Sequence, residues 1–212
     1  MKPLSECRLY AFVDTAYLHG HPPELVTKQL CDGGADLIQL RAKNSSPEEI
    51  RHLAKMILPI TRTANVGLVI NDYLEIARET GAEFCHLGQE DFFDDGHKHV
   101  SELRMPNDEL QIGLSSHAPE QAQRAIAVGA DYIAIGPVYA TGTKPGAKPA
   151  TLEYVRWAAA NVKIPWFAIG GINLQTLDDV LTAGAKRVCV VSAILNADNV
   201  AKACAQFQKR LA

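Results

Sequence analysis

The feature that most constrains the fold is a short phrase, Gly-Ala followed by a charged residue, which recurs at Gly34, Gly81, Gly129 and Gly184. Each copy lies between a segment with helical periodicity and an apolar run. Glycine at this position supplies the left-handed residue that ends a helix. The copies lie about 50 residues apart, the length of two strand–helix units of about 25 residues each. Eight such units would use nearly the whole chain.

Residues 1–212 are therefore predicted to form a single domain, an α/β chain folded as a (β/α)8 TIM barrel with its active site at the carboxyl ends of the strands. Strict alternation of strands and helices indicates a parallel sheet. A doubly wound open sheet is the alternative, but eight even units in so short a chain favour closure. The predicted strands, all short apolar runs, are 9–13, 37–40, 68–70, 84–87, 111–114, 132–135, 166–169 and 188–191. The clearest predicted helices are 47–61, 73–80, 119–128, 152–160 and 174–183.

Composition limits the classes of function. Hydrophobic residues make up 47% of the chain and charged residues 21%, and the formal net charge of −3 provides no broad basic surface for nucleic acid. No stretch approaches the roughly 20 apolar residues of a membrane span, and the first residues lack the apolar run of a signal peptide. The sequence predicts a cytoplasmic protein that binds small molecules, without nucleic-acid or membrane partners. A homo-oligomer is left open.

The cysteines and histidines do not suggest a metal or redox centre. Five cysteines, far apart and without a Cys-x-x-Cys pair, are expected to be reduced packing residues. The seven histidines show neither the His-x-x-x-His nor the His-Glu-x-x-His spacing of a zinc site. The chemistry is therefore expected at the strand ends, where such barrels carry it.

Cationic side chains follow the second predicted strand. Strand alternation sends Gln39, Arg41 and Lys43 toward one side, at the mouth of the barrel. Arg41 and Lys43 together suit a multiply charged phosphate. The alternative is a solvated pair of charges on the rim.

Two carboxylates follow the third and fourth strands. Mg²⁺ needs few protein oxygen ligands and completes its shell with water and substrate phosphate, a role that suits Asp72 and Asp91. Asp72 could instead cap the helix that follows it, and Asp91 could belong to an acidic loop with Asp94 and Asp95.

The segments that follow the fifth and sixth predicted strands carry side chains with hydroxyl groups. Ser115 and His117 could bind a ligand, although His117 could equally be a structural hydrogen-bonding residue, and the chain lacks the Gly-x-Ser-x-Gly elbow of a serine hydrolase. In the loop 136–146, Thr141 and Thr143 beside Lys144 form an arrangement suited to phosphate, with an ordinary surface turn as the alternative.

The seventh and eighth strands end in small residues. The pair Gly170-Gly171, and Val191 with Ser192, would let backbone N–H groups approach a phosphate, as the loops after these strands do in many barrels. The alternative is that the glycines only permit a tight turn.

Taken in order, the motifs QLRAK, IND, HLGQED, GLSSH, GPVYATGTK, AIGGI and VVSAI resemble the thiamine-phosphate synthase family, from about Tyr10 to Ile194. Together they are highly specific, although any one alone is weak. Members of this family are transferases that join 4-amino-2-methyl-5-(diphosphooxymethyl)pyrimidine to a thiazole phosphate, releasing diphosphate, with Mg²⁺ as cofactor.

The resemblance implies a role for each group of residues. The pyrimidine diphosphate would be bound by Gln39, Leu40, Arg41, Ala42, Lys43, Asn71, Ser115 and Lys144. The thiazole phosphate would be bound by Thr141, Gly142, Thr143, Gly171, Val191 and Ser192. Mg²⁺ would be bound by Asp72 and Asp91, and the catalytic contribution would come from Arg41, Lys43, Lys144 and Ser115.

The chain departs from the family pattern in two places. The family often has a glycine in the turn before the helix after strand six, where this chain reads Pro149-Ala150-Thr151-Leu152. The segment 92–106 is richer in polar residues than the pattern and could reshape the loop after strand four. Neither departure removes a predicted ligand.

The expected mechanism is departure of diphosphate, aided by the cationic groups and Mg²⁺, followed by attack of the thiazole nitrogen, without a protein nucleophile. One alternative is the related thiazole tautomerase, which would use His117 for proton transfer. Another is a non-catalytic sensor of a thiamine precursor. An aldolase or phosphate isomerase is disfavoured because no lysine lies inside an apolar strand end.

Overall fold

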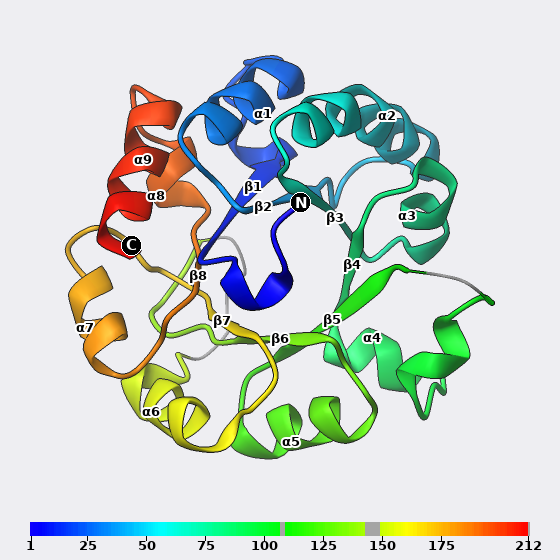
Figure 1. Ribbon diagram of the computed structural model, residues 1–212, viewed down its shortest axis with the longest axis vertical. Helices are drawn as coiled ribbons and strands as arrows, with labels where there is room; N and C mark the ends of the chain where they lie inside the picture. Colours follow the sequence, from blue (N-terminus) through cyan, green and yellow to red (C-terminus); the bar gives the residue numbers. More distant parts are fainter. Residues whose placement is uncertain (107–108, 143–148, 212) are drawn as a thin grey trace.

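In the computed structural model, which describes residues 1–106, 109–142 and 149–211, eight parallel strands form a closed barrel in chain order (Figure 1). The predicted barrel is confirmed. The strands are β1 (Leu9–Asp14), β2 (Leu37–Arg41), β3 (Gly67–Asn71), β4 (Phe84–Leu87), β5 (Gln111–Ser116), β6 (Tyr132–Ile135), β7 (Trp166–Ala168) and β8 (Val188–Cys189).

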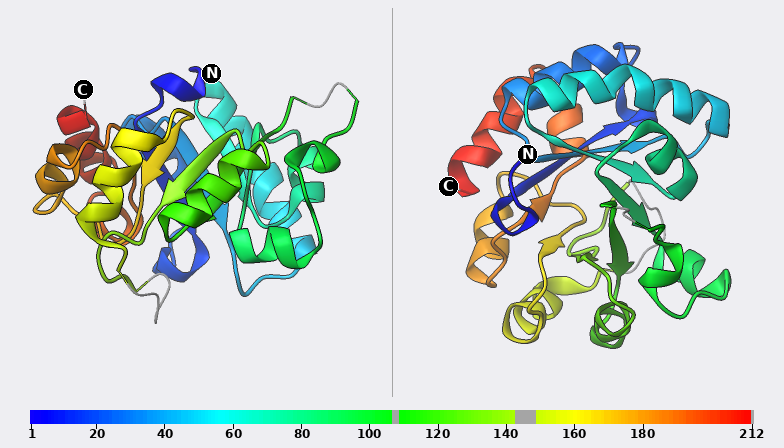
Figure 2. Two further views of the ribbon diagram at one scale, coloured as in Figure 1. Left: turned by 90° about the horizontal axis from the view of Figure 1, so that it is seen from below. Right: turned by 45° about the vertical axis from the view of Figure 1, so that its right-hand side comes forward.

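Helices surround the strands. Both termini lie at the end of the barrel opposite the short helix η2 (Thr15–Tyr17), which follows β1 (Figure 2). The α-helices are α1 (Pro23–Asp32), α2 (Pro47–Thr63), α3 (Leu74–Thr80), α4 (Gln89–Asp94), α5 (Pro119–Ala127), α6 (Thr151–Asn161), α7 (Leu177–Thr182), α8 (Ser192–Leu195) and α9 (Val200–Leu211). The 3-10 helices are η1 (Leu4–Glu6), η2 (Thr15–Tyr17) and η3 (Val100–Leu103).

The four recurring glycines do what the repeat predicts. Gly34, Gly81, Gly129 and Gly184 have φ values of 84°, 76°, 83° and 103°, all in the left-handed region. Each follows a helix and precedes a strand, so the phrase marks the point where the chain turns back into the barrel.

Aromatic side chains fill the barrel interior. The Tyr10 ring meets Tyr132 and Phe167 edge to face at centroid distances of 6.3 and 5.3 Å, and Phe84 lies 6.2 Å from Tyr132. A Cβ at residue 113 would lie 2.1 Å from the Tyr132 ring, so Gly113 makes room for it. This packed layer gives any cavity at the carboxyl end a floor.

Some predicted boundaries shift for local reasons. β5 continues through Ser116, because Ser115 and Ser116 still pair with β6. β7 and β8 are shorter than predicted; after β7, Gly170 has a φ of 103°, which ends the extended conformation. α7 begins at Leu177, because Asn173 Oδ1 accepts from the Gln175 and Thr176 N–H groups and forms a turn first.

The two departures from the family pattern have structural answers. Thr151, the first residue of α6, has a φ of 63°, so a left-handed residue stands at the start of this helix, in the conformation that glycine adopts most readily. The polar segment after β4 forms α4 and η3, and Phe92, Val100 and Leu103 pack into the core.

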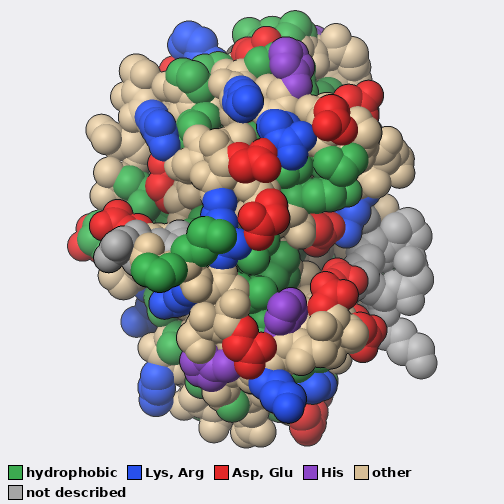
Figure 3. Space-filling model, turned by 90° about the vertical axis from the view of Figure 1, so that its right-hand side faces the viewer, with side chains coloured by type: hydrophobic (Ala, Val, Ile, Leu, Met, Phe, Trp, Pro, Cys, Tyr) green, Lys and Arg blue, Asp and Glu red, His purple; other side chains and the backbone are tan. Residues whose placement is uncertain are grey.

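The surface carries both signs of charge. On the face shown in Figure 3, Lys and Arg side chains are interspersed with Asp and Glu. No helix among the described residues is long and apolar enough to cross a membrane. The five cysteines are free thiols, and four of them are buried.

A buried carboxylate ties the amino ends of the first two strands together. Asp36 accepts hydrogen bonds from the Arg8 and Leu9 N–H groups at 2.8 and 3.0 Å and from Lys2 Nζ at 2.6 Å. Burial opposes ionisation of this carboxyl, but these hydrogen bonds outweigh it and hold its pKa below the ordinary value.

Replacing Asp36 with Asn should lower the free energy of unfolding at neutral pH by about 1–3 kcal/mol, since charge-assisted hydrogen bonds are lost. The wild-type advantage is present above the ordinary carboxyl pKa and should disappear as the pH falls through the lowered folded-state value. Urea denaturation across that range measures it. Asp32→Asn, which disrupts an exposed pair with Lys28, should change stability little; equal effects of the two changes would contradict the prediction.

Candidate functional site

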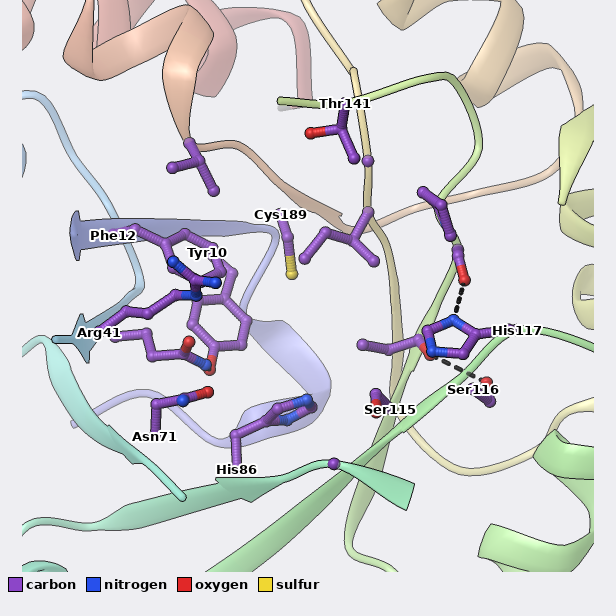
Figure 4. Close-up of a pocket in the computed structure, with 18 of the residues that line it drawn as sticks. Tyr10, Phe12, Arg41, Asn71, His86, Ser115, Ser116, His117, Thr141 and Cys189 are labelled. Atoms are coloured by element: carbon purple, nitrogen blue, oxygen red, sulfur yellow. Dashed lines mark hydrogen bonds between the residues drawn. The ribbon is translucent and has the colours of Figure 1, made fainter. Parts of the chain in front are cut away.

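A cavity of about 400 Å³ opens at the carboxyl ends of the strands (Figure 4). Residues from β1 through the turn after β8 form its walls. The predicted site residues that line it are Gln39, Arg41, Lys43, Asn71, Asp72, Asp91, Ser115, Thr141, Gly171, Val191 and Ser192.

Three described residues of the predicted set, Leu40, Ala42 and Gly142, are not among this lining. The side chains of Leu40 and Ala42 are buried and alternate with the inward-facing Gln39 and Arg41, so only their backbone could reach a ligand. Gly142 lies beside the Tyr17 hydroxyl, which would be 3.5 Å from a Cβ at that position. Thr143 and Lys144 lie outside the described residues.

The two cations of the second strand end each meet a carboxylate. Arg41 Nη1 donates to Asp14 Oδ2 at 2.7 Å, and Lys43 Nζ donates to Asp72 Oδ2 at 2.5 Å. The first pair is largely buried, whereas the Lys43 and Asp72 side chains are 50% and 26% exposed. Since an exposed ion pair contributes little stabilisation, Lys43 can exchange Asp72 for another anion.

The predicted metal ligands face the same cavity. Asp72 has a φ of 66° and does not cap α3, whose N-cap residue is Tyr73, so the capping alternative is not what the structure shows. Asp91 lies in the first turn of α4, and a Cβ at residue 88 would lie 2.2 Å from its Oδ2; Gly88 makes room for this carboxylate. Asp94 lies outside the cavity lining.

Ser115 joins β5 to α4. Its Oγ accepts a hydrogen bond from the Gln89 N–H at 3.2 Å, and the Gln89 side-chain amide donates to the Gln121 carbonyl at 2.8 Å. The Ser115 hydroxyl therefore has an oriented oxygen and can direct its own hydrogen toward a ligand.

His117 is anchored to the neighbouring strand end. Its Nδ1 lies 2.6 Å from the Gly136 carbonyl oxygen, a contact that requires Nδ1 to be the donor (Figure 4). A neutral His117 then has an acceptor at Nε2. Both readings of this residue from the sequence, as a ligand-binding group and as a structural one, are compatible with its place in the cavity wall.

Neutral polar groups form the floor of the cavity. Gln39 Nε2 donates to the Tyr10 hydroxyl at 2.6 Å, and His86 lies with its ring 5.6 Å from that of Tyr132. Burial lowers the pKa of His86 to about 4, with Asp72 opposing the shift and Lys43 adding to it. His86 Nδ1 is buried without a hydrogen-bond partner among the described residues. A neutral polar floor of this kind suits an uncharged heterocycle.

Backbone groups dominate the opposite wall. The Gly171, Ile172 and Ser192 N–H groups donate no hydrogen bond to any described residue. Gly171 has a φ of 66°, and a Cβ there would lie 2.6 Å from the Ala140 carbonyl oxygen, so only glycine fits. Such N–H groups suit a phosphate.

The family model for thiamine monophosphate synthase matches residues 9–194. The chain belongs to this family. It is 41% identical over 187 residues to the thiamine-phosphate synthase of Thermus thermophilus, covering 87% of each, and 42% identical over 212 residues to that of Acidothermus cellulolyticus, covering 99% of this chain and 97% of the relative.

Solved structures agree with this assignment. The thiamine phosphate pyrophosphorylase of Pyrococcus furiosus superimposes with a TM-score of 0.85 at 29% identity, covering 98% of this chain and 96% of that one. A 3-hexulose-6-phosphate synthase, at 19% identity and a TM-score of 0.63, shares the fold alone. The family predicted from the motifs, and with it the prediction of a transferase, is confirmed.

Sequence reasoning missed several polar groups at the site, among them His86 and Asp14. His86 lies within a quoted motif and shares the inward alternation of Phe84, which would have placed it inside the barrel. Asp14 directly follows the apolar residues of β1, so the rule applied to the other strand ends would have found it.

The His86 imidazole should stay neutral from pH 8 to pH 5 and titrate near pH 4, since the charged form is buried. Nuclear magnetic resonance of labelled histidines measures this, with His86→Gln assigning the signal. Because the unfolded chain takes up this proton near pH 6.5, the wild type should also lose stability as the pH falls from about 6.5 to about 4, and the variant should lack that component. A midpoint near 6.5 would contradict the prediction.

Proposed function

We propose that this chain condenses 4-amino-2-methyl-5-(diphosphooxymethyl)pyrimidine with a thiazole phosphate, forming thiamine phosphate and diphosphate. The observation that carries the proposal is the division of one cavity into two unlike halves. Cations and carboxylates come from the end of β2, from the residues that follow β2 and β3, and from α4, and backbone N–H groups come from the turns after β7 and β8. Two phosphorylated substrates can be held facing each other across such a cavity.

The cationic half suits the diphosphate. Arg41 can form paired hydrogen bonds with phosphate oxygens, and Lys43 can leave Asp72 for the more highly charged ligand. In the same step Asp72 would lose its ion-pair partner, so it would become available to a cation. Lys144, outside the described residues, is proposed to close on the same diphosphate on the strength of the motif.

The carboxylates suit Mg²⁺. Asp72 and Asp91 line one cavity, and Gly88 leaves space for the second carboxylate. Mg²⁺ usually takes one or two protein carboxylates and completes its shell with water and phosphate, so two carboxylates are enough to bind it here. When bound, Mg²⁺ would neutralise part of the charge on the departing diphosphate.

The floor of the cavity suits the aminopyrimidine. The Gln39 side-chain N–H donates to the Tyr10 hydroxyl. The side-chain carbonyl oxygen of Gln39 can then accept a hydrogen bond from an exocyclic amino group of the substrate. Asn71, Ser115 and neutral His86 add uncharged hydrogen-bonding groups around it. These residues would orient the ring so that its methylene carbon faces the other half of the cavity.

The thiazole phosphate is assigned to the backbone wall. The Gly171 and Ser192 N–H groups would bind its oxygens, and Thr141 would add a hydroxyl from the loop after β6. Gly142 and Val191 would contribute backbone only. Thr143, outside the described residues, is assigned to the same phosphate by the motif.

The reaction needs no protein nucleophile. Arg41 and Lys43 would stabilise the negative charge that develops as the C–O bond to diphosphate breaks. The electron-rich aminopyrimidine would spread the positive charge on its methylene carbon, and the thiazole nitrogen would then donate its electron pair to that carbon. The site residues would bind the two substrates, orient them and neutralise the charge that develops, which are the tasks that charged and hydrogen-bonding groups can perform.

A thiazole tautomerase stays the second candidate, because His117 lines the cavity with an oriented ring. Isomerising a monophosphate does not require Arg41, Lys43 and two carboxylates in the same cavity, and this favours the synthase. We also propose a cytoplasmic enzyme of small-molecule substrates.

The decisive test is diphosphate release by the purified protein from the pyrimidine diphosphate with Mg²⁺, with and without thiazole phosphate. Release should require the thiazole phosphate and yield thiamine phosphate in equal amount. Isomerisation of the thiazole alone would favour the tautomerase. Binding of both compounds without release would favour the sensor.

Asp72→Asn and Asp91→Asn should each lower turnover by about 100-fold or more and raise the Mg²⁺ concentration needed for half-maximal rate, since each removes a proposed ligand charge. Steady-state diphosphate release over a Mg²⁺ titration measures both effects. Asp94→Asn is the matched control, because Asp94 lies on the same helix outside the cavity and should leave the rate unchanged. Full turnover without Mg²⁺ would refute the metal role.

Gly171→Ala should raise the KM for thiazole phosphate about tenfold or more, because the new Cβ meets the loop after β6 and the left-handed φ strains the residue. The KM for the pyrimidine diphosphate should change much less. Gly34→Ala imposes similar backbone strain at the opposite end of the barrel and should lower stability without moving either KM. Equal changes in both KM values would argue against a separate thiazole phosphate half.

A further inference from the structure

Asp14 ends β1 with a carboxylate that is almost completely buried, at 1% exposure. Its Oδ1 accepts from the Ala16 N–H at 3.0 Å, at the start of η2, and its Oδ2 accepts from Arg41 Nη1 at 2.7 Å. Asp14 and Arg41 are also register partners across β1 and β2. Each carboxylate oxygen is therefore fixed by a different element, which gives the group one orientation.

Arg41 lies at the cavity wall, and Asp14 lies behind it. Arg41 is among the described residues that line it and is 19% exposed, whereas Asp14 is not among them (Figure 4). A ligand that enters the cavity would meet the guanidinium, with the carboxylate behind it. Phe12, which stacks on Tyr10 at a centroid distance of 5.2 Å, lines the cavity from the same strand.

We propose that Asp14 is a positioning residue, which holds the Arg41 guanidinium in the orientation that binds the diphosphate of the pyrimidine substrate. The inference rests on the proposed function, in which Arg41 binds that diphosphate. A guanidinium is a rigid planar fork of five N–H donors, so fixing one of them constrains the direction of the others. Ordering this long side chain before the ligand arrives removes an entropic cost from binding.

A carboxylate near an anion site has an opposing effect, because it repels the anion. The ion pair with Arg41 and the place of Asp14 behind it both reduce that repulsion. The two effects have opposite signs when Asp14 is replaced by Asn. Loss of positioning weakens diphosphate binding, and loss of repulsion strengthens it. The direction of the change therefore distinguishes them.

A purely structural role has a matched comparison in the same strand pair. Asp36 is another buried carboxylate that bonds to backbone N–H groups and to one cation, but at the amino end of β1 and β2. Asp36→Asn should lower stability and leave substrate binding intact. Asp14→Asn keeps an oxygen for the Ala16 N–H, so it removes the charge with little change in shape.

The experiment measures binding of inorganic diphosphate with Mg²⁺ by calorimetry, and both KM values, for wild type, Asp14→Asn and Asp36→Asn. Asp14→Asn should raise the diphosphate Kd and the KM for the pyrimidine diphosphate about tenfold, and change the KM for thiazole phosphate by less than about twofold. Arg41→Lys should also weaken diphosphate binding. If Asp14 acts through Arg41, adding Asp14→Asn to Arg41→Lys should have much less effect than adding it to wild type.

Unchanged or tighter diphosphate binding by Asp14→Asn, with binding weakened by Arg41→Lys, would overturn the positioning role and leave the diphosphate site standing. Unchanged binding by Arg41→Lys as well would show that the diphosphate site itself is misplaced, and the inference would fall with it. Fully additive effects in the double variant would mean that Asp14 acts independently of Arg41, which also overturns the proposal.

Discussion

The parallel register of the closed barrel is the constraint on which the site depends. Every strand ends on the same face, so groups far apart in the chain become neighbours: Asp14 lies opposite Arg41, and Asn71 lies opposite His86. Beneath them the packed aromatic layer around Tyr132 fills the interior of the barrel. Closure and packing together create a cavity that is open at one end, with strand-end residues as its walls.

Charge balance organises the cationic half of this cavity. Arg41 and Lys43 each lie against a carboxylate, but the two pairs differ in exposure, and exposure decides what each can do. The buried Arg41–Asp14 pair would be costly to break, since it would leave a charge unpaired away from water. The exposed Lys43–Asp72 pair costs little to exchange. Arg41 is therefore held in place, whereas Lys43 can change its partner. This combination suits a multiply charged anion that must both bind and dissociate.

The other half relies on backbone geometry. Gly171 and the turn into α8 present N–H groups, and the close approach of the loop after β6 leaves no room for a side chain at residue 171. The floor between the halves is polar but uncharged, with His86 kept neutral by burial. Charge, neutral hydrogen bonding and backbone N–H groups thus occupy separate parts of one cavity, in the order that two phosphorylated heterocycles would require.

The repeated glycine phrase and the apolar runs determined the number, order and parallel direction of the strands, because left-handed helix stops and strand hydrophobicity are local properties. The same local rule found Arg41, Asp72 and Ser115 at the strand ends. Only the tertiary structure decided which groups meet: that Asp14 lies behind Arg41 and that Lys43 pairs with Asp72. It also decided that His86 is neutral. Contacts between strands and the loss of water around a side chain depend on residues distant in the chain, and no local pattern contains them.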